Sequence, residues 1–294
     1  MEKIVITTDS GIDPICEENM IPGQIIENGE KSYRDKIDIN QKEILNKIKE
    51  GSVFKTASPL IGDYEDKFVS ILEQKKDVIH LSMSSGISEG SVNSANLIAN
   101  ILNEEYENKV YVIDTLNGAT GGTLIDILAN NLVKQGLTTK EIIEQLNVLK
   151  KYVQTSFFVP NPEGFIKSGR NKSDLCLKDK AKLIGTKAAS MAGIKYRVDF
   201  NDEGNLYVKS TMKCKTKLGM LKLIKNILNE QTVKNYKDNY VVIGNVLEKD
   251  VEMNQVKEYI EQLEYFKNIV VQDINGVVAA YGSEDLCGIS LIKK

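Results

Sequence analysis

The first half of the chain alternates short β-branched segments with amphipathic helical patterns, and this rhythm constrains the fold more than any other feature. Apolar segments at 3–9, 77–83 and 109–114 each run into a polar loop, and a helical pattern follows the second and third of them. Strands that alternate with helices of this length favour right-handed βαβ units. We therefore predict an N-terminal α/β domain over 1–159, with a mainly parallel sheet flanked by helices.

The rhythm changes after a proline-containing junction at 159–164. A hairpin is expected around Gly204, and the later strands and helices no longer alternate regularly. This pattern predicts a C-terminal α+β domain over 160–294 with a mixed or antiparallel sheet. Its expected strands lie near 240–245, 268–274, 277–281 and 288–292, and its expected helices lie near 216–229 and 251–266.

Local signals fix several element ends. Asn28-Gly29 is typical of a hairpin turn, which a third residue can lengthen. Asn40 with Glu43, and Thr138 with Glu141, have the spacing of capping boxes at helix starts. Two helices are therefore expected to begin next to Asn40 and Thr138.

Three polar loops follow the predicted parallel strands. Ligands bind open α/β sheets outside the carboxyl ends of the strands, so each of these loops is a candidate site. They are "TDSGID" (8–13), "SSGISEG" (84–90) and "TLNGATGG" (115–122). The serine-rich loop can bind an anion through hydroxyl and N–H groups, or it can simply cap the helix predicted over 92–102.

Composition excludes several classes of protein. A net charge of −3 and a pI near 5.5 argue against a nucleic-acid binder. No apolar run approaches 18 residues, so no stable membrane insertion is expected. The start, "MEKIVITTDS", lacks the features of a signal peptide, and a cytoplasmic location is expected. The four cysteines are far apart and are interpreted as reduced thiols: Cys16, Cys176, Cys214 and Cys287.

The sequence gives little sign of catalysis. Its single histidine, His80, lies within a predicted buried strand, and both usual nucleotide-binding loop motifs are missing. Asp9 and Asp114 follow strands and are interpreted as loop caps that accept backbone N–H bonds. We therefore expect a protein that is not an enzyme, without a cofactor or metal. The alternative is an enzyme acting on a small phosphorylated or carboxylated substrate at the same loops.

Seven short motifs occur in one order along residues 3–292 and together resemble one known family. The family is the DegV family, which includes the bacterial fatty-acid-binding subunits of the fatty acid kinase system. The motifs are "TDSGID" (8–13), "YRDKIDI" (33–39), "FKTASP" (54–59), "LSMSSGIS" (81–88), "VIDTLNGATGG" (112–122), "IKSGR" (166–170) and "IKYRV" (194–198).

The resemblance implies a carrier that holds a long-chain fatty acid in a tunnel between two domains, with a fatty acid kinase subunit as a candidate partner. In the family a threonine and a serine bind the carboxylate, and the matching residues here are Thr56 and Ser88. Arg170 matches a family arginine, which contacts an anion near the pocket mouth or forms a surface salt bridge. The predicted fatty-acid-binding residues are Thr56, Ser58, Ser85, Gly86, Ser88, Arg170 and Tyr281.

Three departures from the family pattern lie at this site. Ala57 replaces a serine after Thr56, and Glu89 is an extra residue after Ser88, which leaves Ser85 and Ser91 as rivals for the carboxylate. Tyr281 occupies the place of a family histidine and can supply a hydroxyl instead. The tail is expected to dominate affinity, since each buried CH₂ contributes about 0.8 kcal/mol. A charge-assisted bond to the head contributes about 1.5–3 kcal/mol and fixes its orientation.

Overall fold

The computed structural model describes residues 3–159, 194–213, 216–230, 240–245, 250–281 and 286–293. Its first sheet is parallel and has the strand order β2-β1-β6-β7. The strands are β1 (Ile4–Asp9), β2 (Met20–Ile21), β6 (Asp77–Ser82) and β7 (Val110–Asp114). Helices α2 (Ile61–Leu72) and α3 (Ser85–Glu105) pack on one face, and α4 (Thr120–Lys134) and α5 (Thr139–Leu149) pack on the other. The parallel α/β prediction is confirmed; this sheet and its four helices are the N-terminal lobe.

The second sheet is mixed, as predicted, with the order β10-β9-β8-β13-β11-β12. Only the β11–β12 pair is parallel among its described pairings. Its strands are β8 (Val153–Val159), β9 (Ile194–Phe200), β10 (Leu206–Lys213), β11 (Tyr240–Asn245), β12 (Asn268–Asp273) and β13 (Cys287–Ile292). Since β8 pairs with β9 and β13, this sheet begins before residue 160, where the predicted C-terminal domain starts. The division into two domains stays a prediction.

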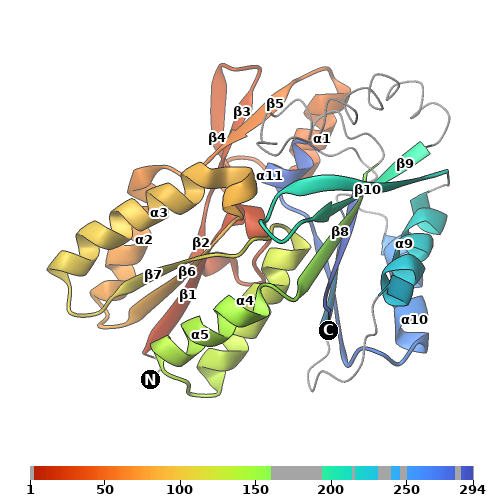
Figure 1. Cartoon of the computed structure of the whole chain (residues 1–294). Coiled ribbons are helices and arrows are strands. Elements are labelled where there is room, and N and C mark those ends of the chain that lie inside the picture. Colours follow the sequence, from red (N-terminus) through yellow and green to blue (C-terminus); the bar gives the residue numbers. More distant parts are fainter. Residues whose placement is uncertain are drawn as a thin grey trace.

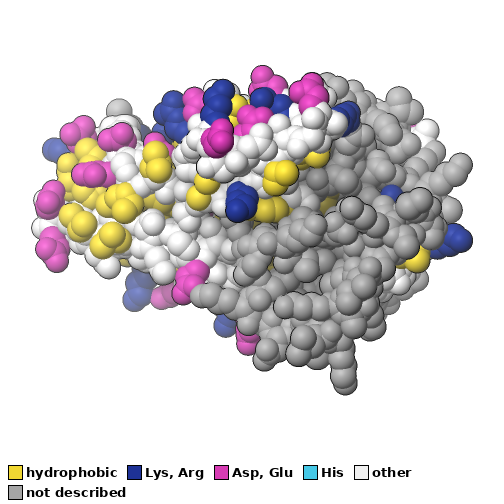
Figure 2. All heavy atoms as spheres, turned by 90° about the horizontal axis from the view of Figure 1, so that it is seen from above, with side chains coloured by type: hydrophobic (Ala, Val, Ile, Leu, Met, Phe, Trp, Pro, Cys, Tyr) yellow, Lys and Arg dark blue, Asp and Glu magenta, His cyan; other side chains and the backbone are white. Residues whose placement is uncertain are grey.

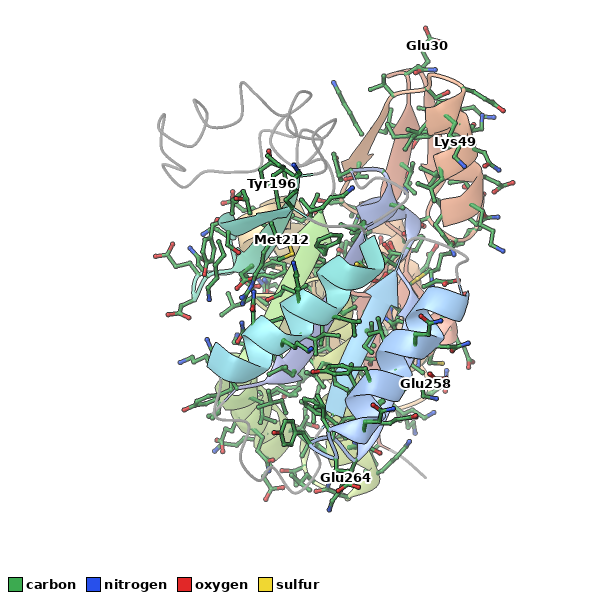
Figure 3. The ribbon with its side chains drawn as sticks, turned by 90° about the vertical axis from the view of Figure 1, so that its right-hand side faces the viewer. Glu30, Lys49, Tyr196, Met212, Glu258 and Glu264 are labelled. Atoms are coloured by element: carbon green, nitrogen blue, oxygen red, sulfur yellow. The ribbon has the colours of Figure 1, made fainter. Side chains whose placement is uncertain are left out.

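Helix α4 lies between the two sheets and joins their cores (Figure 1). It contacts β1 of the first sheet and β8, β11 and β13 of the second. Helices α9 (Thr216–Glu230) and α10 (Asp250–Gln262) lie side by side on the opposite face of the second sheet (Figure 3). The second sheet with α9 and α10 is the C-terminal lobe. The order of layers is therefore helix, sheet, helix, sheet, helix.

A small antiparallel sheet extends the N-terminal lobe, with the order β4-β3-β5. It consists of β3 (Gln24–Glu27), β4 (Lys31–Arg34) and β5 (Phe54–Ala57), and it is flanked by α1 (Gln41–Lys49). The hairpin turn has positive φ angles of 54° at Asn28 and 78° at Gly29, with Glu30 as the third loop residue. Both predicted capping boxes are present, at Asn40 and at Thr138.

Two predictions of secondary structure were wrong. The segment near 277–281, expected as a strand, begins with the short helix α11 (Gly276–Ala279). Asn275 caps this helix by accepting a hydrogen bond from the Val278 N–H, and the Asp35 carboxylate accepts from two further N–H groups of its first turn. These polar partners come from outside the segment, so its apolar, β-branched sequence could not reveal them.

Helix α3 begins at Ser85 rather than at 92. The Ser84 side chain accepts from the Gly86 N–H, which caps the helix seven residues earlier than the apolar pattern indicated. The serine-rich segment is therefore a helical start joined through a kink to the body of α3, rather than a loop. Ser88 has non-helical angles (φ −133°, ψ 68°) and divides this start from the body of the helix.

The surface of the described part mixes both signs of charge. Figure 2 shows Lys and Arg side chains interspersed with Asp and Glu, and hydrophobic side chains gathered toward the end formed by α2 and α3. Exposed Leu97 and Ile101 of α3 belong to the molecule's apolar surface. No helix among the described residues has the length and hydropathy needed to cross a bilayer. Cys16 and Cys287 are free thiols, as predicted, while Cys176 and Cys214 lie outside the described residues.

Candidate fatty-acid head-group site

The end of β5 lies against the start of α3. A Cβ atom added to Gly90 would come within 2.6 Å of the Ser58 hydroxyl oxygen, so Ser58 lies directly beside the helix backbone. Strand β5 ends at Ala57, and Thr56 is its penultimate residue. Ser58 of the "TASP" segment is therefore brought next to Gly90 of α3, although more than 30 residues lie between them in the chain.

Thr56 is joined to Tyr281 from the C-terminal part of the chain. The Tyr281 hydroxyl oxygen accepts from the Thr56 N–H at 2.9 Å and lies 2.9 Å from the Thr56 hydroxyl. Tyr281 follows helix α11, which the Asp35 carboxylate holds against the small sheet. The predicted replacement of a histidine by Tyr281 thus gives a tyrosine hydroxyl in direct contact with Thr56.

Ser88 and Ser91 form a second hydroxyl pair, with 2.8 Å between their side-chain oxygens. Ser88 is half-buried and Ser91 is buried, while the additional residue Glu89 is exposed. The interruption of the helix at Ser88 coincides with this additional residue. Ser88 and Ser91, two of the alternative carboxylate-binding residues, therefore lie in contact, and the choice between them stays a prediction.

The backbone N–H groups at the start of α3 are already used within the protein. Ser85 N–H donates to Asp114 Oδ1, and Gly86 N–H donates to the Ser84 hydroxyl oxygen. The N–H groups of Ile87 and Ser88 both reach the Ser84 carbonyl oxygen. The N–H groups of residues 85 to 88 are therefore paired within the protein, and the expectation that they assist anion binding stays a prediction.

A buried polar cluster lies beneath the serine pair. The Asp9 carboxylate accepts from the Tyr64 hydroxyl at 2.8 Å, from the Ser82 hydroxyl at 2.7 Å and from the Met83 N–H at 2.9 Å. Burial alone would raise the pKa of Asp9, but His80, Ser82 and Met83 together hold it below its usual value. The interpretation of Asp9 as a loop cap is confirmed only in part, because Asp9 accepts one backbone N–H bond, from Met83, and makes no side-chain bond to the turn that follows it.

Tyr64 connects this cluster to the serine pair. Its hydroxyl lies 3.3 Å from the Ser91 carbonyl oxygen as well as 2.8 Å from Asp9. Tyr64 is fully buried in helix α2, so this contact fixes the backbone of α3 where Ser88 and Ser91 project. The helical spacing of Tyr64, Phe68 and Ile71 in the sequence indicates only an apolar face, and the hydroxyl of Tyr64 is the one signal of a polar role.

His80 is a structural residue, as predicted. It is fully buried, and its Nδ1 lies 3.0 Å from the Thr7 hydroxyl while its Nε2 lies 3.2 Å from Asp9 Oδ1. The second contact has the distance of an ion pair without the geometry of a hydrogen bond. The rings of Tyr64 and Phe68 meet the imidazole edge-on. His80 is therefore enclosed by the core and cannot reach a ligand at the loops.

The remaining predicted site residues divide into three groups. Ser85 and Gly86 belong to the helix start but face the β9–β10 turn, since a Cβ on Gly86 would lie 2.5 Å from the Gly204 carbonyl oxygen. Asp114 accepts from the N–H groups of Ser85 and Leu116, which confirms it as a loop cap. Arg170 lies outside the described residues. No cluster of potential metal ligands occurs among the residues that the structure describes.

Comparison with known protein families shows the family to which the chain belongs. The profile of the family described as "Uncharacterised protein, DegV family" matches residues 3–294. The chain belongs to the DegV family. A DegV domain-containing protein of Clostridium acetobutylicum is 26% identical over 301 residues, which covers all of both chains.

Solved structures of DegV proteins share the fold of this chain. A DegV family protein of Thermus thermophilus, described as binding fatty acid, has a TM-score of 0.81 at 19% identity. A fatty acid kinase B3 protein of Streptococcus pneumoniae, loaded with linoleic acid, has the same TM-score at 20% identity. Each alignment covers 99% of this chain and 100% of the other. The resemblance inferred from the seven motifs and the predicted fold class are both confirmed.

Proposed function

We propose that this DegV protein binds a long-chain fatty acid without transforming it. The carboxylate contacts the Thr56 and Ser88 hydroxyls, and the tail occupies an apolar tunnel between the N-terminal and C-terminal lobes. One observation carries the proposal: the hydroxyl pairs Thr56–Tyr281 and Ser88–Ser91 lie on segments that meet where Ser58 contacts Gly90. The full-length likeness to DegV proteins described as binding fatty acids supports the class of ligand.

The serine pair suits a carboxylate. Two hydroxyl groups carry two hydrogens, and the Ser88–Ser91 contact uses one of them. The second hydrogen can be donated to an external anion, and a charge-assisted bond of this kind contributes about 1.5–3 kcal/mol. Because Tyr64 fixes the backbone at Ser91, the pair is ordered before the ligand arrives and little conformational entropy is lost on binding.

The different roles of the tail and the carboxylate in binding suit a carrier protein. Tail burial supplies most of the affinity, whereas the hydroxyls set the direction of the chain and hold the carboxylate at the half-buried Ser88. A carboxylate held at an opening is accessible to a second protein. We propose a fatty acid kinase subunit as that partner, in line with the likeness to a fatty acid kinase B3 protein.

The first experiment identifies the ligand. Lipids released from several preparations of the purified protein are analysed by mass spectrometry, and we expect a long-chain fatty acid in each. Affinities for a series of saturated acids should then rise with chain length by at most about 0.8 kcal/mol per CH₂ until the tunnel is filled. Preparations without an acyl chain, together with affinities that ignore chain length, would contradict the proposal.

The second experiment tests the head-group residues. Thr56→Val and Tyr281→Phe each remove a hydroxyl with little change in side-chain size. Each should lower the affinity for fatty acid several-fold, measured by displacement of a fluorescent fatty acid. Tyr111→Phe, which changes an exposed tyrosine of β7, is the matched control and should bind like the parent protein. Equal affinities for all three variants would place the carboxylate elsewhere.

A further inference from the structure

A hollow whose lining includes neither Thr56 nor Ser88 lies between the N-terminal and C-terminal lobes. It has a volume of about 230 Å³ and is enclosed by the loop after β7, the end of α5, the start of β8 and the β9–β10 hairpin. Four lysines and two aspartates contribute the charged groups of its lining: Lys150, Lys151, Lys209, Lys293, Asp199 and Asp202. The lining therefore carries a formal surplus of two positive charges, in a protein whose net charge is −3.

The more buried of the two aspartates already has a strong partner. Asp199 forms a bidentate pair with Arg197, with both N–H···O distances at 2.9 Å, and the Arg197 side chain is only 1% exposed. The Lys209 ammonium lies 3.5 Å from the same carboxylate. Asp199 is thus neutralised by the guanidinium, and its charge does little to offset the lysines around the hollow.

The second aspartate is a weak partner. Asp202 is 97% exposed, and its carboxylate lies 3.8 Å from the Lys293 ammonium, which is the contact of a solvent-screened ion pair. An exposed aspartate is easily displaced from a lysine by an anion that enters the hollow.

Lys150 and Lys151 line the hollow next to the end of α5. Lys150 Nζ donates to the Asp114 carbonyl oxygen at 2.8 Å, which orders the side chain. Burial lowers the pKa of Lys150, Asp114 counteracts this effect, and the neighbouring Lys151 lowers it further. A bound anion would relieve both the desolvation and the repulsion between the two lysines.

We propose that this hollow binds a small phosphate-bearing anion. Several lysine ammonium groups around one concave space are typical of phosphate recognition, and Gln154, Asn201 and Tyr207 add polar side chains to the lining. Pockets for drug-sized ligands span about 300–1,000 Å³, so a hollow of about 230 Å³ suits a free phosphate or a short phosphate ester. Neither Thr56 nor Ser88 lines it, so this site is independent of the proposed fatty-acid site.

The test is a titration followed by phosphorus NMR at constant ionic strength, with inorganic phosphate and methyl phosphate as probes and acetate as a competitor. We expect saturable broadening with both probes or with one, and weak competition by acetate. Tighter binding of methyl phosphate identifies an ester as the ligand, and binding of inorganic phosphate alone identifies the free anion. Absence of saturable binding in the millimolar range overturns the proposal.

Variants locate the site. K151Q/K293Q removes two lining charges and should weaken phosphate binding at least tenfold, and the single variant K151Q, at an exposed side chain, should give part of this loss. K134Q/K140Q removes two exposed lysines outside the hollow and is the matched control. Binding that survives K151Q/K293Q, or that falls equally in both double variants, refutes the proposal. Fatty-acid displacement should be unchanged in every variant, so a failure here leaves the proposed function intact.

Discussion

Two neighbouring strand-to-helix connections, after β6 and after β7, have similar compositions but differ in burial. The connection after β7 is buried: Asn117, Thr120, Gly121 and Gly122 are enclosed where α4 enters the space between the sheets. Its hydroxyl and amide groups bond to residues of the second sheet. The connection after β6 keeps Ser85 to Ser88 half-exposed, and its Ser88–Ser91 pair lies at the edge of the lobe.

The difference shows that a Ser, Thr and Gly-rich connection at the carboxyl end of a strand has two uses. Where a second sheet covers it, the small residues permit close packing and the polar groups bond to each other. Where it stays at an edge, the same residue types leave hydroxyls that a ligand can reach. The four predictions below test this distinction, and they are ordered by expected change in stability.

Gly122→Ala should cost the most stability. A methyl group on Gly122 would clash with the Cβ of Ile12 and lie 2.7 Å from its Cα. The Ile12 backbone cannot easily move away to make room. We expect a loss of about 3 kcal/mol in the free energy of unfolding, measured by urea denaturation. Gly62→Ala, at an exposed helical glycine with no atom within 4 Å of the added carbon, is the control and should be neutral or stabilising. A small effect of Gly122→Ala would mean that α4 is not tightly held between the sheets.

Ser290→Ala should cost about 1–2 kcal/mol, because it disrupts a buried hydroxyl network. The Ser290 oxygen lies 2.7 Å from the Thr120 hydroxyl and 2.8 Å from the Thr155 hydroxyl, and Thr155 donates to Asn117. Fatty-acid affinity should stay the same, which a displacement titration checks. Lost affinity with unchanged stability would reverse the roles assigned to the two connections.

The buried carboxyl group of Asp13 predicts that the free energy of unfolding depends on pH. Burial raises the pKa of Asp13 to about 7, from 3.8 in the absence of structure, although the Asn275 N–H donates to its carboxylate. The folded protein therefore retains a proton that the unfolded chain releases, and stability falls as pH rises from about 4 to about 7. Asp13→Asn should reduce this fall by an amount on the order of 1 kcal/mol, measured by urea denaturation at pH 5 and pH 8. Burial also raises the pKa of Asp35 to about 6, so the stability of the Asp13→Asn variant should still fall somewhat as pH rises. If the stability of Asp13→Asn and of the parent protein changed equally with pH, the raised pKa of Asp13 would be contradicted.

Ser88→Ala should have the smallest effect on stability and a clear effect on ligand binding. The Ser88 side chain is half-buried and its hydroxyl contacts the Ser91 hydroxyl, so a change within about 0.5 kcal/mol is expected. Fatty-acid affinity should fall several-fold, because the pair then loses the hydrogen available to the carboxylate. Ser70→Ala, at a hydroxyl that bonds only within α2, is a control in which both quantities should stay near the parent values. Unchanged affinity in Ser88→Ala would transfer the role to Ser91 or Ser85.

Much of the fold could be predicted because its signals are local. The alternation of apolar segments gave β1, β6 and β7, and the spacing of Asn40 with Glu43 located the start of α1 to the residue. Family resemblance added Thr56, Ser88 and Tyr281, of which the structure joins Thr56 to Tyr281 and Ser88 to Ser91. One error came where a distant group decides local structure, at α11, where Asp35 accepts from two N–H groups of the first turn. The other came at the start of α3, where the local cap Ser84 was missed.

By itself, the sequence determined which segments are strands and helices, because side-chain periodicity and capping act over a few residues. It also supplied the hydroxyl-bearing residues of the candidate site. Only the tertiary structure decided which of two similar connections is buried, since that depends on α4 lying between two sheets whose strands come from both ends of the chain. It likewise decided that the Ser85 N–H bonds to Asp114, because Asp114 ends the neighbouring strand β7 and reaches the start of α3 only when the sheet has formed.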